Sequence, residues 1–313
     1  MSVIKIQAPG LLTTVQDLGR EGFGPIGVSP SGAADPISLR MGNRLVGNVE
    51  SAAGLEMTLL GGTFLFPERA IIALTGSDFG ATVDDSPIAT GTSIEVWPGQ
   101  TLRLGPTRSG ARCYFCVQGG IAVAPFLRSA STHLLSGLGG FDGRPLHEGD
   151  ILQVGPATKP FRERTIAPHV LEQLSPRKVL RVTAGPQVEW FSESSLHSFY
   201  TATYRVGEQS NRMGLRLEGA VVSPRDTRQM ITEGVSLGAV QVPAGGLPII
   251  LFVDQQTTGG YPKIANVISA DLHRIGQLRP RDEIRFEQVT FEAARSLLIE
   301  QERLLASTEA ILE

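Results

Sequence analysis

The sequence predicts a mainly β protein with few short helices. Among its 313 residues are 36 glycines and 20 prolines, which are unfavourable in helices and common in turns. Charged residues make up only 19% of the chain. Short runs of alternating or β-branched residues recur along it, separated by Gly, Pro, Asp or Asn. Regularly spaced short strands with such turns are typical of β barrels and β sandwiches.

Strands are expected wherever these runs occur. In chain order they cover residues 3–8, 63–76 (two strands about Pro67), 93–105, 111–123, 150–155, 179–185, 201–207, 214–222, 238–243, 248–253 and 283–289. The run at 248–253 is short, apolar and rich in β-branched residues, which indicates a fully buried strand rather than a helix.

Three helical segments are expected. Asp35 and Pro36 start the clearest one, because Asp is a good N-cap and Pro fits the first helical position. Ile37, Met41 and Leu45 then recur at four-residue spacing. Residues 269–277 predict one or two helical turns, and residues 290–306 predict a C-terminal helix with one apolar face.

Similar patterns in the two halves of the chain predict two related barrels. Residues 58–67 (TLLGGTFLFP) align with 215–224 (LRLEGAVVSP), and a turn precedes an alternating strand at 99–105, 149–155 and 281–287. The segment 156–178 is rich in Pro and charge, so the junction is expected there. The predicted domains are an N-terminal barrel at 1–165, a C-terminal barrel at 166–290 and a terminal helix at 291–313.

Composition excludes several function classes. The net charge of −3 gives no sign of a nucleic-acid or anionic-membrane partner. No apolar run approaches the ~20 residues of a membrane span. The start, MSVIKIQAPG, lacks the regions of a signal peptide, so a cytoplasmic protein is expected. The two cysteines, Cys113 and Cys116, lie in a strand pattern where positions three apart face opposite sides, which indicates two structural thiols.

The densest polar segment follows the buried run at 248–253. It supplies an acid, amides, hydroxyls, a phenol and an ammonium within ten residues, and its paired glycines let the backbone approach a ligand. An ordinary polar turn at a strand end is the alternative. The candidate site residues here are Asp254, Gln256, Thr257, Thr258, Gly259, Gly260, Tyr261 and Lys263.

Four shorter segments carry further candidates: 13–20, 29–35, 210–214 and 232–241. The Ser/Gly-rich loop at 29–35 enters a helix, whose free N–H groups and dipole suit a carboxylate or phosphate, unless they serve ordinary capping. Arg212 could hold an anion bidentately or form a surface ion pair, and Glu233 could be a buried acid or a turn residue. These segments add Gln16, Asp17, Arg20, Ser31, Arg212, Glu233 and Gln241 to the candidates.

Several catalytic signatures are absent from the sequence. The five histidines share no metal-ligand spacing, and neither a GxxxxGK[ST] loop nor an HExxH helix occurs. Walker-type nucleotide binding, zinc proteolysis and a Ser-His-Asp triad are therefore disfavoured.

Six segments together resemble the allophanate hydrolase subunit 2 family, which includes the C subunit of 5-oxoprolinase and the biotin-dependent carboxyltransferase domain of urea carboxylase. They are TTVQDLGR (13–20), SPSGAADP with NRLVGN (29–36 and 43–48), LEMTLLGG (55–62), SNRMGLRLEG (210–219), EGVSLGAVQVP (233–243) and DQQTTGGYPKIANVISADL (254–272). The resemblance runs in order from about residue 3 to residue 289.

The resemblance implies two cyclophilin-like β-barrel domains. It also implies two partners, namely the homologue of subunit 1 (the B subunit of 5-oxoprolinase) and the homologue of the A subunit. It implies ATP-dependent hydrolysis of the lactam of 5-oxoproline to glutamate, active only with those partners. ATP and magnesium would be bound by the partner subunits or shared with them. The chain has no AMKM-type biotinylation site and no ATP-grasp region, so no covalent biotin is expected on it.

Two alternatives stay open. The chain could be the carboxyltransferase component of a biotin-dependent urea or amide carboxylase, or a non-catalytic regulatory protein that binds the subunit 1 homologue.

For lactam hydrolysis, residue chemistry suggests the roles. The expected catalytic residues are Asp254, Lys263, Tyr261 and Glu233, with Asp254 or Glu233 as base and Lys263 and Arg212 as anion donors. Gln16, Gln241, Gln256 and Thr258 are expected to read the ring amide. Lys263 is expected in a loop, where replacement by Ala would leave folding intact. All these segments are expected to converge on one site between the two barrels.

Overall fold

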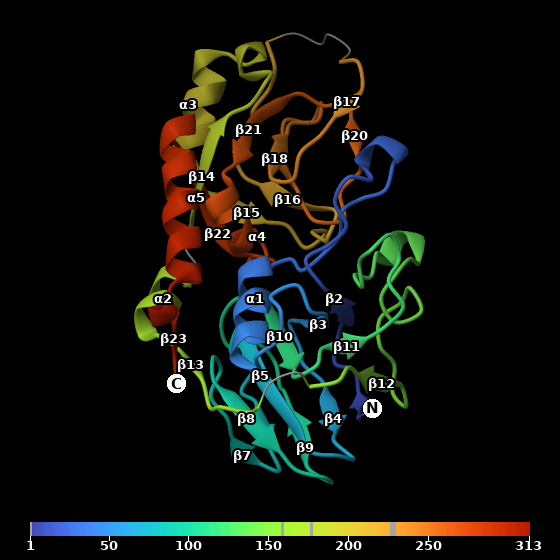
Figure 1. Cartoon of the computed structure of the whole chain (residues 1–313). Coiled ribbons are helices and arrows are strands. Elements are labelled where there is room, and N and C mark those ends of the chain that lie inside the picture. Colours follow the sequence, from blue (N-terminus) through green and yellow to red (C-terminus); the bar gives the residue numbers. More distant parts are fainter. Residues whose placement is uncertain (1, 158–159, 176–177, 226–229) are drawn as a thin grey trace. The chain divides into compact units, whose positions relative to one another are not determined.

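The computed structural model describes residues 2–157, 160–175, 178–225 and 230–313. The chain forms two compact units (Figure 1). Unit 1 comprises Met1–Arg20, Ser31–Ser175 and Leu305–Glu313, and unit 2 comprises Glu21–Pro30 and Pro176–Leu304. Each unit consists of separate segments of the sequence, whereas each predicted domain is one continuous segment. The predicted domain bounds stay a prediction. Within the predicted junction, residues 158–159 and 176–177 lie outside the described residues.

The two larger sheets in the described part of unit 1 are antiparallel. The seven-stranded sheet has the order β11-β12-β1-β4-β9-β6-β7, and the five-stranded sheet has the order β2-β3-β10-β5-β8. The first consists of β1 (Val3–Ala8), β4 (Thr63–Leu65), β6 (Thr82–Val83), β7 (Ser86–Pro87), β9 (Thr101–Arg103), β11 (Ile121–Ala122) and β12 (Ile151–Val154). The second consists of β2 (Thr13–Gln16), β3 (Gly54–Thr58), β5 (Ala70–Gly76), β8 (Ser93–Val96) and β10 (Arg112–Val117).

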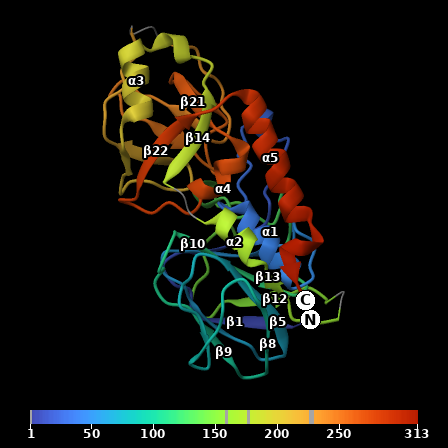
Figure 2. The ribbon, with the colours of Figure 1, turned by 90° about the vertical axis from the view of Figure 1, so that its left-hand side faces the viewer.

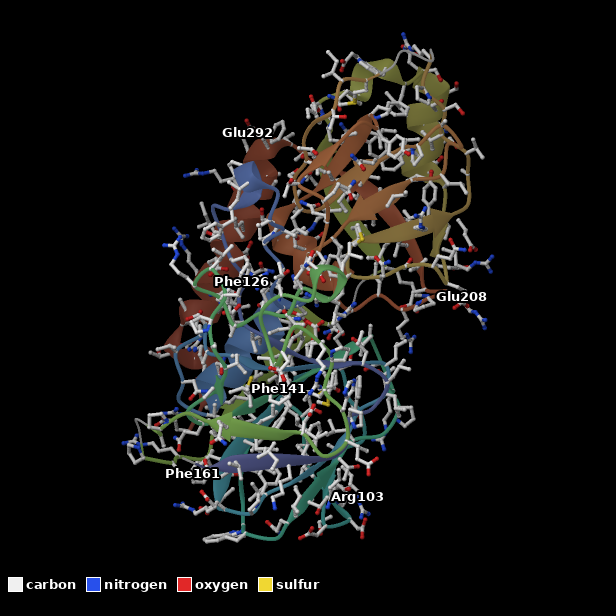
Figure 3. All side chains as sticks on the ribbon, turned by 90° about the vertical axis from the view of Figure 1, so that its right-hand side faces the viewer. Arg103, Phe126, Phe141, Phe161, Glu208 and Glu292 are labelled. Atoms are coloured by element: carbon white, nitrogen blue, oxygen red, sulfur yellow. The ribbon has the colours of Figure 1, made fainter. Side chains whose placement is uncertain are left out.

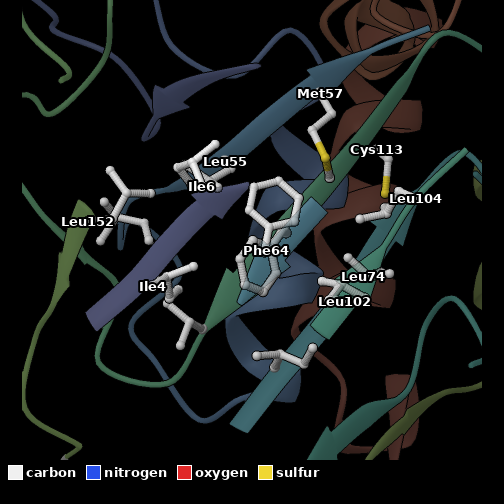
Figure 4. Close-up of a cluster of buried hydrophobic side chains, with 14 of the residues drawn as sticks. Ile4, Ile6, Leu55, Met57, Phe64, Leu74, Leu102, Leu104, Cys113 and Leu152 are labelled. Carbon is white, nitrogen blue, oxygen red and sulfur yellow. The ribbon is translucent and has the colours of Figure 1, made fainter. Parts of the chain in front are cut away.

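One apolar core joins the two sheets of unit 1 (Figure 4). Ile4 and Ile6 of β1 are buried in it, while Lys5 between them is exposed, as the alternating pattern predicts. The Phe115 ring of β10 contacts the Phe64 ring of β4, with centroids 5.4 Å apart, and so links one sheet to the other.

Helix α1 (Pro36–Leu45) packs on β5 and β10. Its N-cap is Asp35, whose side chain accepts hydrogen bonds from the Ser38 N–H (3.0 Å) and hydroxyl (2.6 Å). The Cys116 Sγ lies 3.7 Å from the Leu39 carbonyl oxygen of this helix, whereas Cys113 lies in the apolar core. The thiols thus face opposite sides of β10, as the sequence predicts, and burial raises the pKa of each.

Unit 2 contains a closed barrel of order β14-β21-β18-β19-β16-β15-β22. The parallel pairing of β14 with β22 closes it, and the other neighbouring pairs are antiparallel. The strands are β14 (Val179–Ala184), β15 (Tyr204–Val206), β16 (Gly214–Glu218), β18 (Ala239–Gln241), β19 (Ile249–Leu251), β21 (Lys263–Val267) and β22 (Glu283–Gln288). A small separate sheet pairs β17 (Glu233–Gly234) with β20 (Thr258–Gly259).

The two units contain further helices. They are α2 (Pro168–Leu174), α3 (Glu193–Thr201), α4 (Leu272–Ile275) and α5 (Phe291–Ala306), with 3₁₀ turns η1 (Gly24–Ile26), η2 (Leu134–Ser136), η3 (Val188–Trp190), η4 (Ser269–Asp271) and η5 (Thr308–Ala310). In unit 1, β13 (Thr165–Ile166) pairs with β23 (Ile311–Leu312). In unit 2, α3 covers β22 (Figure 2), where the Phe199 and Phe286 rings stack at 4.5 Å.

The prediction of a mainly β fold is confirmed, and the three expected helical segments are present as α1, η4 with α4, and α5. Helices α2 and α3 were not expected. The Ser192 hydroxyl caps α3 by accepting from the Ser195 N–H at 3.1 Å, and Phe199 anchors it in the core. Ser192 followed by Glu193 is an N-terminal signal that the strand-dominated pattern concealed.

Candidate functional site

A β-bulge in unit 2 places Lys263 opposite Gln241. Strands β18 and β21 pair Val240 with Ala265, and the register then shifts so that Gln241 pairs with Lys263. A regular antiparallel ladder would have paired Gln241 with Ile264 instead. Opposed residues project from the same face, with Cβ atoms roughly 4.5–5.5 Å apart. The bulge therefore brings the ammonium of Lys263 to the face that carries the Gln241 amide.

Lys263 is buried and forms an ion pair with Glu233. The Lys263 side chain is 5% exposed, and its Nζ contacts Glu233 Oε1. Glu233 lies on β17 opposite Gly259 of β20, and its side chain is 46% exposed. An unpaired buried ammonium would be strongly destabilising, so the carboxylate stabilises Lys263 in its place. The exposure of Glu233 leaves this pair open to water and to a ligand.

Gln187 bridges the two members of the ion pair. Its Nε2 donates to Glu233 Oε1 at 2.9 Å, and its Oε1 accepts from the Lys263 backbone N–H at 3.1 Å. Gly185 permits this approach, since a Cβ there would lie 2.2 Å from the Lys263 carbonyl oxygen. The segment 185–187, which follows β14, thus contacts and holds the backbone of the bulge.

These contacts set the charge of Glu233. The hydrogen bond from Lys263, followed by that from Gln187, lowers the pKa of the Glu233 carboxyl below its ordinary value. Glu233 is consequently an ionised hydrogen-bond acceptor at neutral pH. A carboxylate of this kind is a weak base, suited to taking a proton from water as the water attacks an already activated carbon.

The Gln241 amide offers a free donor on the same face. Gln241 is buried, and its Nε2 has no hydrogen-bond partner within the described part of the chain. A Cβ at position 259 would lie 2.5 Å from this nitrogen, so Gly259 leaves the room that the amide occupies. A buried donor without a partner is unfavourable. A carbonyl or carboxylate oxygen of a ligand would satisfy it.

Arg212 and Asp254 form a second, fully buried ion pair. Arg212 Nε donates to Asp254 Oδ2 at 2.8 Å and Nη2 donates to Oδ1 at 3.3 Å. The side chains are 7% and 4% exposed, and the Asp254 N–H also donates to the Arg212 carbonyl oxygen at 2.9 Å. This pairing favours a structural role for both, and their predicted roles as anion donor and base stay predictions.

The remaining candidates of this segment lie about β20. Gln256, Thr258, Gly260 and Tyr261 are exposed, Tyr261 at 48%. Thr257 is partly buried, and its carbonyl accepts from the Val235 N–H at 3.1 Å. These side chains can contact a ligand only from the solvent side of β20.

In unit 1, Asp17 has its carboxylate occupied by the protein. Its Oδ1 accepts from the Gly19 N–H (2.8 Å) and from the hydroxyls of Ser129 (2.6 Å) and Ser131 (2.5 Å), and Oδ2 accepts from the Ala130 N–H (2.6 Å). Asp17 therefore anchors the loop 129–131.

Arg20, Gln16 and Ser31 are the other candidates of unit 1. Arg20 donates to the Ser131 carbonyl and lies over the Phe126 ring, labelled in Figure 3, at 5.6 Å from its centroid. Gln16 Oε1 and Ser31 Oγ are buried without a hydrogen-bond partner among the described residues, and Ser31 adopts a left-handed φ of 52°. Contact of Gln16 and Ser31 with a substrate stays a prediction.

The backbone N–H groups at the start of α1 are bonded within the protein, as the capping alternative predicts, and an external anion there stays a prediction. The Ala34 N–H donates to Glu56 Oε2 at 2.8 Å, and the Asp35 N–H donates to the Tyr114 hydroxyl at 2.7 Å. That hydroxyl donates in turn to Glu56 Oε2 at 2.7 Å, and Arg112 pairs with Glu56 Oε1 at 3.3 Å. The buried carboxylate of Glu56 thus supplies a negative charge at the start of α1.

The structure brings together Glu233, Gln241, Gly259 and Lys263 from four strands of unit 2. It adds Gln187, which the sequence analysis missed. The sequence does carry a signal for it, since the strand β14 (Val179–Ala184) is followed directly by Gly185, Pro186 and the polar Gln187. A single site shared by the segments of both units stays a prediction.

Three further observations concern the described part of the chain. A cavity of about 500 Å³ in unit 2 lies among β16 and the loops 207–209 and 243–249, and no predicted site residue lines it. Among the described residues, no group of three or more His, Cys, Asp or Glu side chains could hold a metal ion. None of the helices seen in those residues is long and apolar enough to span a bilayer.

Comparison with known proteins defines the class. Residues 26–288 match the family model described as carboxyltransferase domain, subdomain A and B. The chain belongs to this family, which confirms the resemblance seen in the sequence.

Two bacterial relatives match along nearly their whole length. The chain is 39% identical to the C subunit of 5-oxoprolinase from Escherichia coli K12 over 301 residues, covering 96% of each chain. It is 37% identical to the C subunit of 5-oxoprolinase from Haemophilus influenzae over 300 residues, again covering 96% of each.

A solved structure shares the fold. The crystal structure of the K. lactis urea amidolyase superposes on 99% of this chain with a TM-score of 0.89 and 32% identity. This chain spans only 21% of that protein, so the likeness concerns one part of a much longer chain.

Proposed function

We propose that this chain is the C subunit of a multi-subunit, ATP-dependent 5-oxoprolinase that hydrolyses the lactam of 5-oxoproline to glutamate. Two relatives that match along 96% of their length carry the name of that 5-oxoprolinase subunit. The structural observation that supports the proposal is the buried Lys263 ammonium, paired with the half-exposed Glu233 carboxylate opposite the Gln241 amide.

The chemistry asks for a donor and an acceptor at one carbon. Hydrolysis adds water to the lactam carbonyl carbon, breaks the ring C–N bond and leaves a carboxylate and an amine. A lactam is a poor electrophile, so ATP would phosphorylate its oxygen and release ADP. Water then adds to the activated carbon, the ring C–N bond breaks, and a second water releases phosphate from the carboxyl group that forms. The site must stabilise the negative charge that develops on the oxygens of this carbon and accept a proton from water.

Residues of unit 2 match both needs. The Lys263 ammonium and the Gln241 Nε2 can donate to an oxygen on the face that they share, and removing one such donor typically lowers kcat by roughly 10²–10³-fold. The ionised Glu233 carboxylate can accept the proton of the attacking water. Tyr261 and Thr258, which are exposed nearby in sequence, can contact the ring from the solvent side.

The proposal includes partner subunits, because the relatives are named as one subunit of an enzyme. We expect these partners to be the homologues of subunit 1 (the B subunit) and of the A subunit, which would bind or share ATP and magnesium. The need for ATP fits the expected cytoplasmic location.

The test is reconstitution of the complex. This chain is co-expressed with the homologues of subunit 1 and of the A subunit, and ATP-dependent release of glutamate from 5-oxoproline is measured. The variant K263M should lose at least about 100-fold in kcat, whereas K5M, which removes an exposed lysine of β1, should retain activity. An assembled wild-type complex that releases no glutamate would refute the proposal.

Carboxyl transfer is the second candidate, favoured by the family description and by the likeness to urea amidolyase. It predicts ATP- and bicarbonate-dependent carboxylation of urea or an amide with a biotinylated partner, which avidin would block. Lactam hydrolysis should not respond to avidin. A third outcome, binding to the subunit 1 homologue with neither activity, would indicate a regulatory protein.

A further inference from the structure

Both polar atoms of the Gln187 side chain form hydrogen bonds with the Glu233–Lys263 pair. Its Nε2 donates to Glu233 Oε1 at 2.9 Å and its Oε1 accepts from the Lys263 N–H at 3.1 Å. The Gln187 backbone N–H also donates to the Lys263 carbonyl oxygen at 3.3 Å. Gln187 is buried, so these contacts are shielded from competition by water.

Glu233, by contrast, has little else to fix its orientation. It lies in β17, a strand of two residues, and its side chain is 46% exposed. An exposed glutamate side chain populates several rotamers unless contacts restrict it. Among the described residues, Gln187 and Lys263 are the partners of its carboxylate, and both contact Oε1.

We infer that Gln187 is a positioning residue that holds Glu233 Oε1 against Lys263 and thereby directs Glu233 Oε2 toward the reacting water. This inference rests on the proposed lactam hydrolysis. With Oε1 occupied by two donors, Oε2 is the oxygen left to accept a proton. Gln187 also holds the backbone of Lys263, so one amide sets the distance between the base and the donor.

The variant Q187E separates positioning from scaffolding. Glutamate has the same size and keeps an oxygen to accept from the Lys263 N–H, but it replaces the donor to Glu233 with a like charge. Displacing a catalytic group by about 1 Å costs on the order of 10²-fold, so we expect kcat to fall roughly 10- to 100-fold with a much smaller change in KM.

The pH profile supplies a readout that a structural role would not move. The acid limb of kcat/KM reports the base of the free enzyme, and a neighbouring carboxylate disfavours the ionised form of Glu233. The acid limb of Q187E should therefore move to higher pH by about one unit. The matched control is Q288E, which adds the same charge at an exposed position of β22 and should leave kcat and the limb unchanged.

The outcomes are decisive. Wild-type kcat and an unmoved acid limb in Q187E overturn the inference. If Q187E fails to fold, Q187M removes the donor without adding charge and should show the same fall in kcat.

If the wild-type complex releases no glutamate, the proposed function fails on its own. The ¹³C NMR titration of Glu233 in the isolated chain then decides: a midpoint unchanged by Q187E overturns the inference, and a raised midpoint supports control of this carboxylate by Gln187.

Discussion

Removal of Arg212 should strongly destabilise unit 2. In the wild-type chain the Asp254 side chain is 4% exposed and accepts two hydrogen bonds from Arg212, of 2.8 and 3.3 Å. The variant R212L removes both hydrogen bonds. Breaking a buried ion pair by deleting one partner typically costs about 3–5 kcal/mol, because the remaining charge is uncompensated. With an m-value of about 2 kcal/mol per molar urea, the unfolding midpoint should fall by about 2 M.

A matched control exists in the same barrel. Arg205 and Glu218 pair across β15 and β16 with side chains 58% and 51% exposed. Exposed pairs contribute only about 0–1 kcal/mol, so R205L should lower the midpoint by less than about 0.5 M.

Tryptophan fluorescence can isolate the transition of unit 2. The chain has two tryptophans, Trp97 in unit 1 and Trp190 in unit 2. In a W97F background the emission of Trp190 reports unit 2 alone. If the R212L midpoint lies within about 0.5 M of the R205L midpoint, the energetic reasoning about this pair is wrong.

Three further predictions concern Lys263, Glu233 and the two cysteines. Lys263 lies buried in β21 and not in the predicted loop. In urea titrations, K263A should therefore lower the unfolding midpoint of unit 2 more than K263M does, because the methionine side chain still fills the space. The lowered pKa of Glu233 contributes to folding stability fully at pH values above the ordinary glutamate pKa, and this contribution is lost as the pH falls through the lowered pKa. In thermal melts, the melting temperatures of E233Q and wild type should therefore differ at pH 7 and converge at acid pH. Cys113 and Cys116 should resist iodoacetamide at pH 8 in the native chain and react after unfolding, as mass spectrometry would show, since burial raises both pKa values.

The fold was largely predictable because its signals are local. Alternation places Ile4 and Ile6 inside and Lys5 outside, and the Asp35-Pro36 pair starts α1 where capping requires. The site was only partly predictable, because its geometry depends on register. No local pattern reveals that β21 bulges at Ile264 and so places Lys263 opposite Gln241.

Long-range pairing explains the other differences. Arg212 and Asp254 are 42 residues apart, so their pairing cannot be seen from the sequence alone. Each residue was therefore predicted to be available to a ligand. Glu56 similarly reads as a strand residue, yet its carboxylate occupies the start of α1. A buried charge attracts its partner from anywhere in the chain, so charged candidates in a folded core tend to meet one another before they meet a ligand.

The surviving site has a property that bears on the alternative chemistries of the family. In the proposed site, Lys263 and Gln241 would donate to an oxygen and Glu233 would accept a proton, but none of them is specific to a lactam. Carboxyl transfer and lactam opening both develop negative charge on a carbonyl oxygen and both need a proton moved beside it. The same group of side chains would therefore suit either reaction, and the substrate would then be determined by which molecule reaches the ammonium of Lys263. The exposed residues about β20 and the partner subunits are the parts able to make that choice, so exchanging partner subunits should change the substrate, while K263M should abolish turnover in every complex.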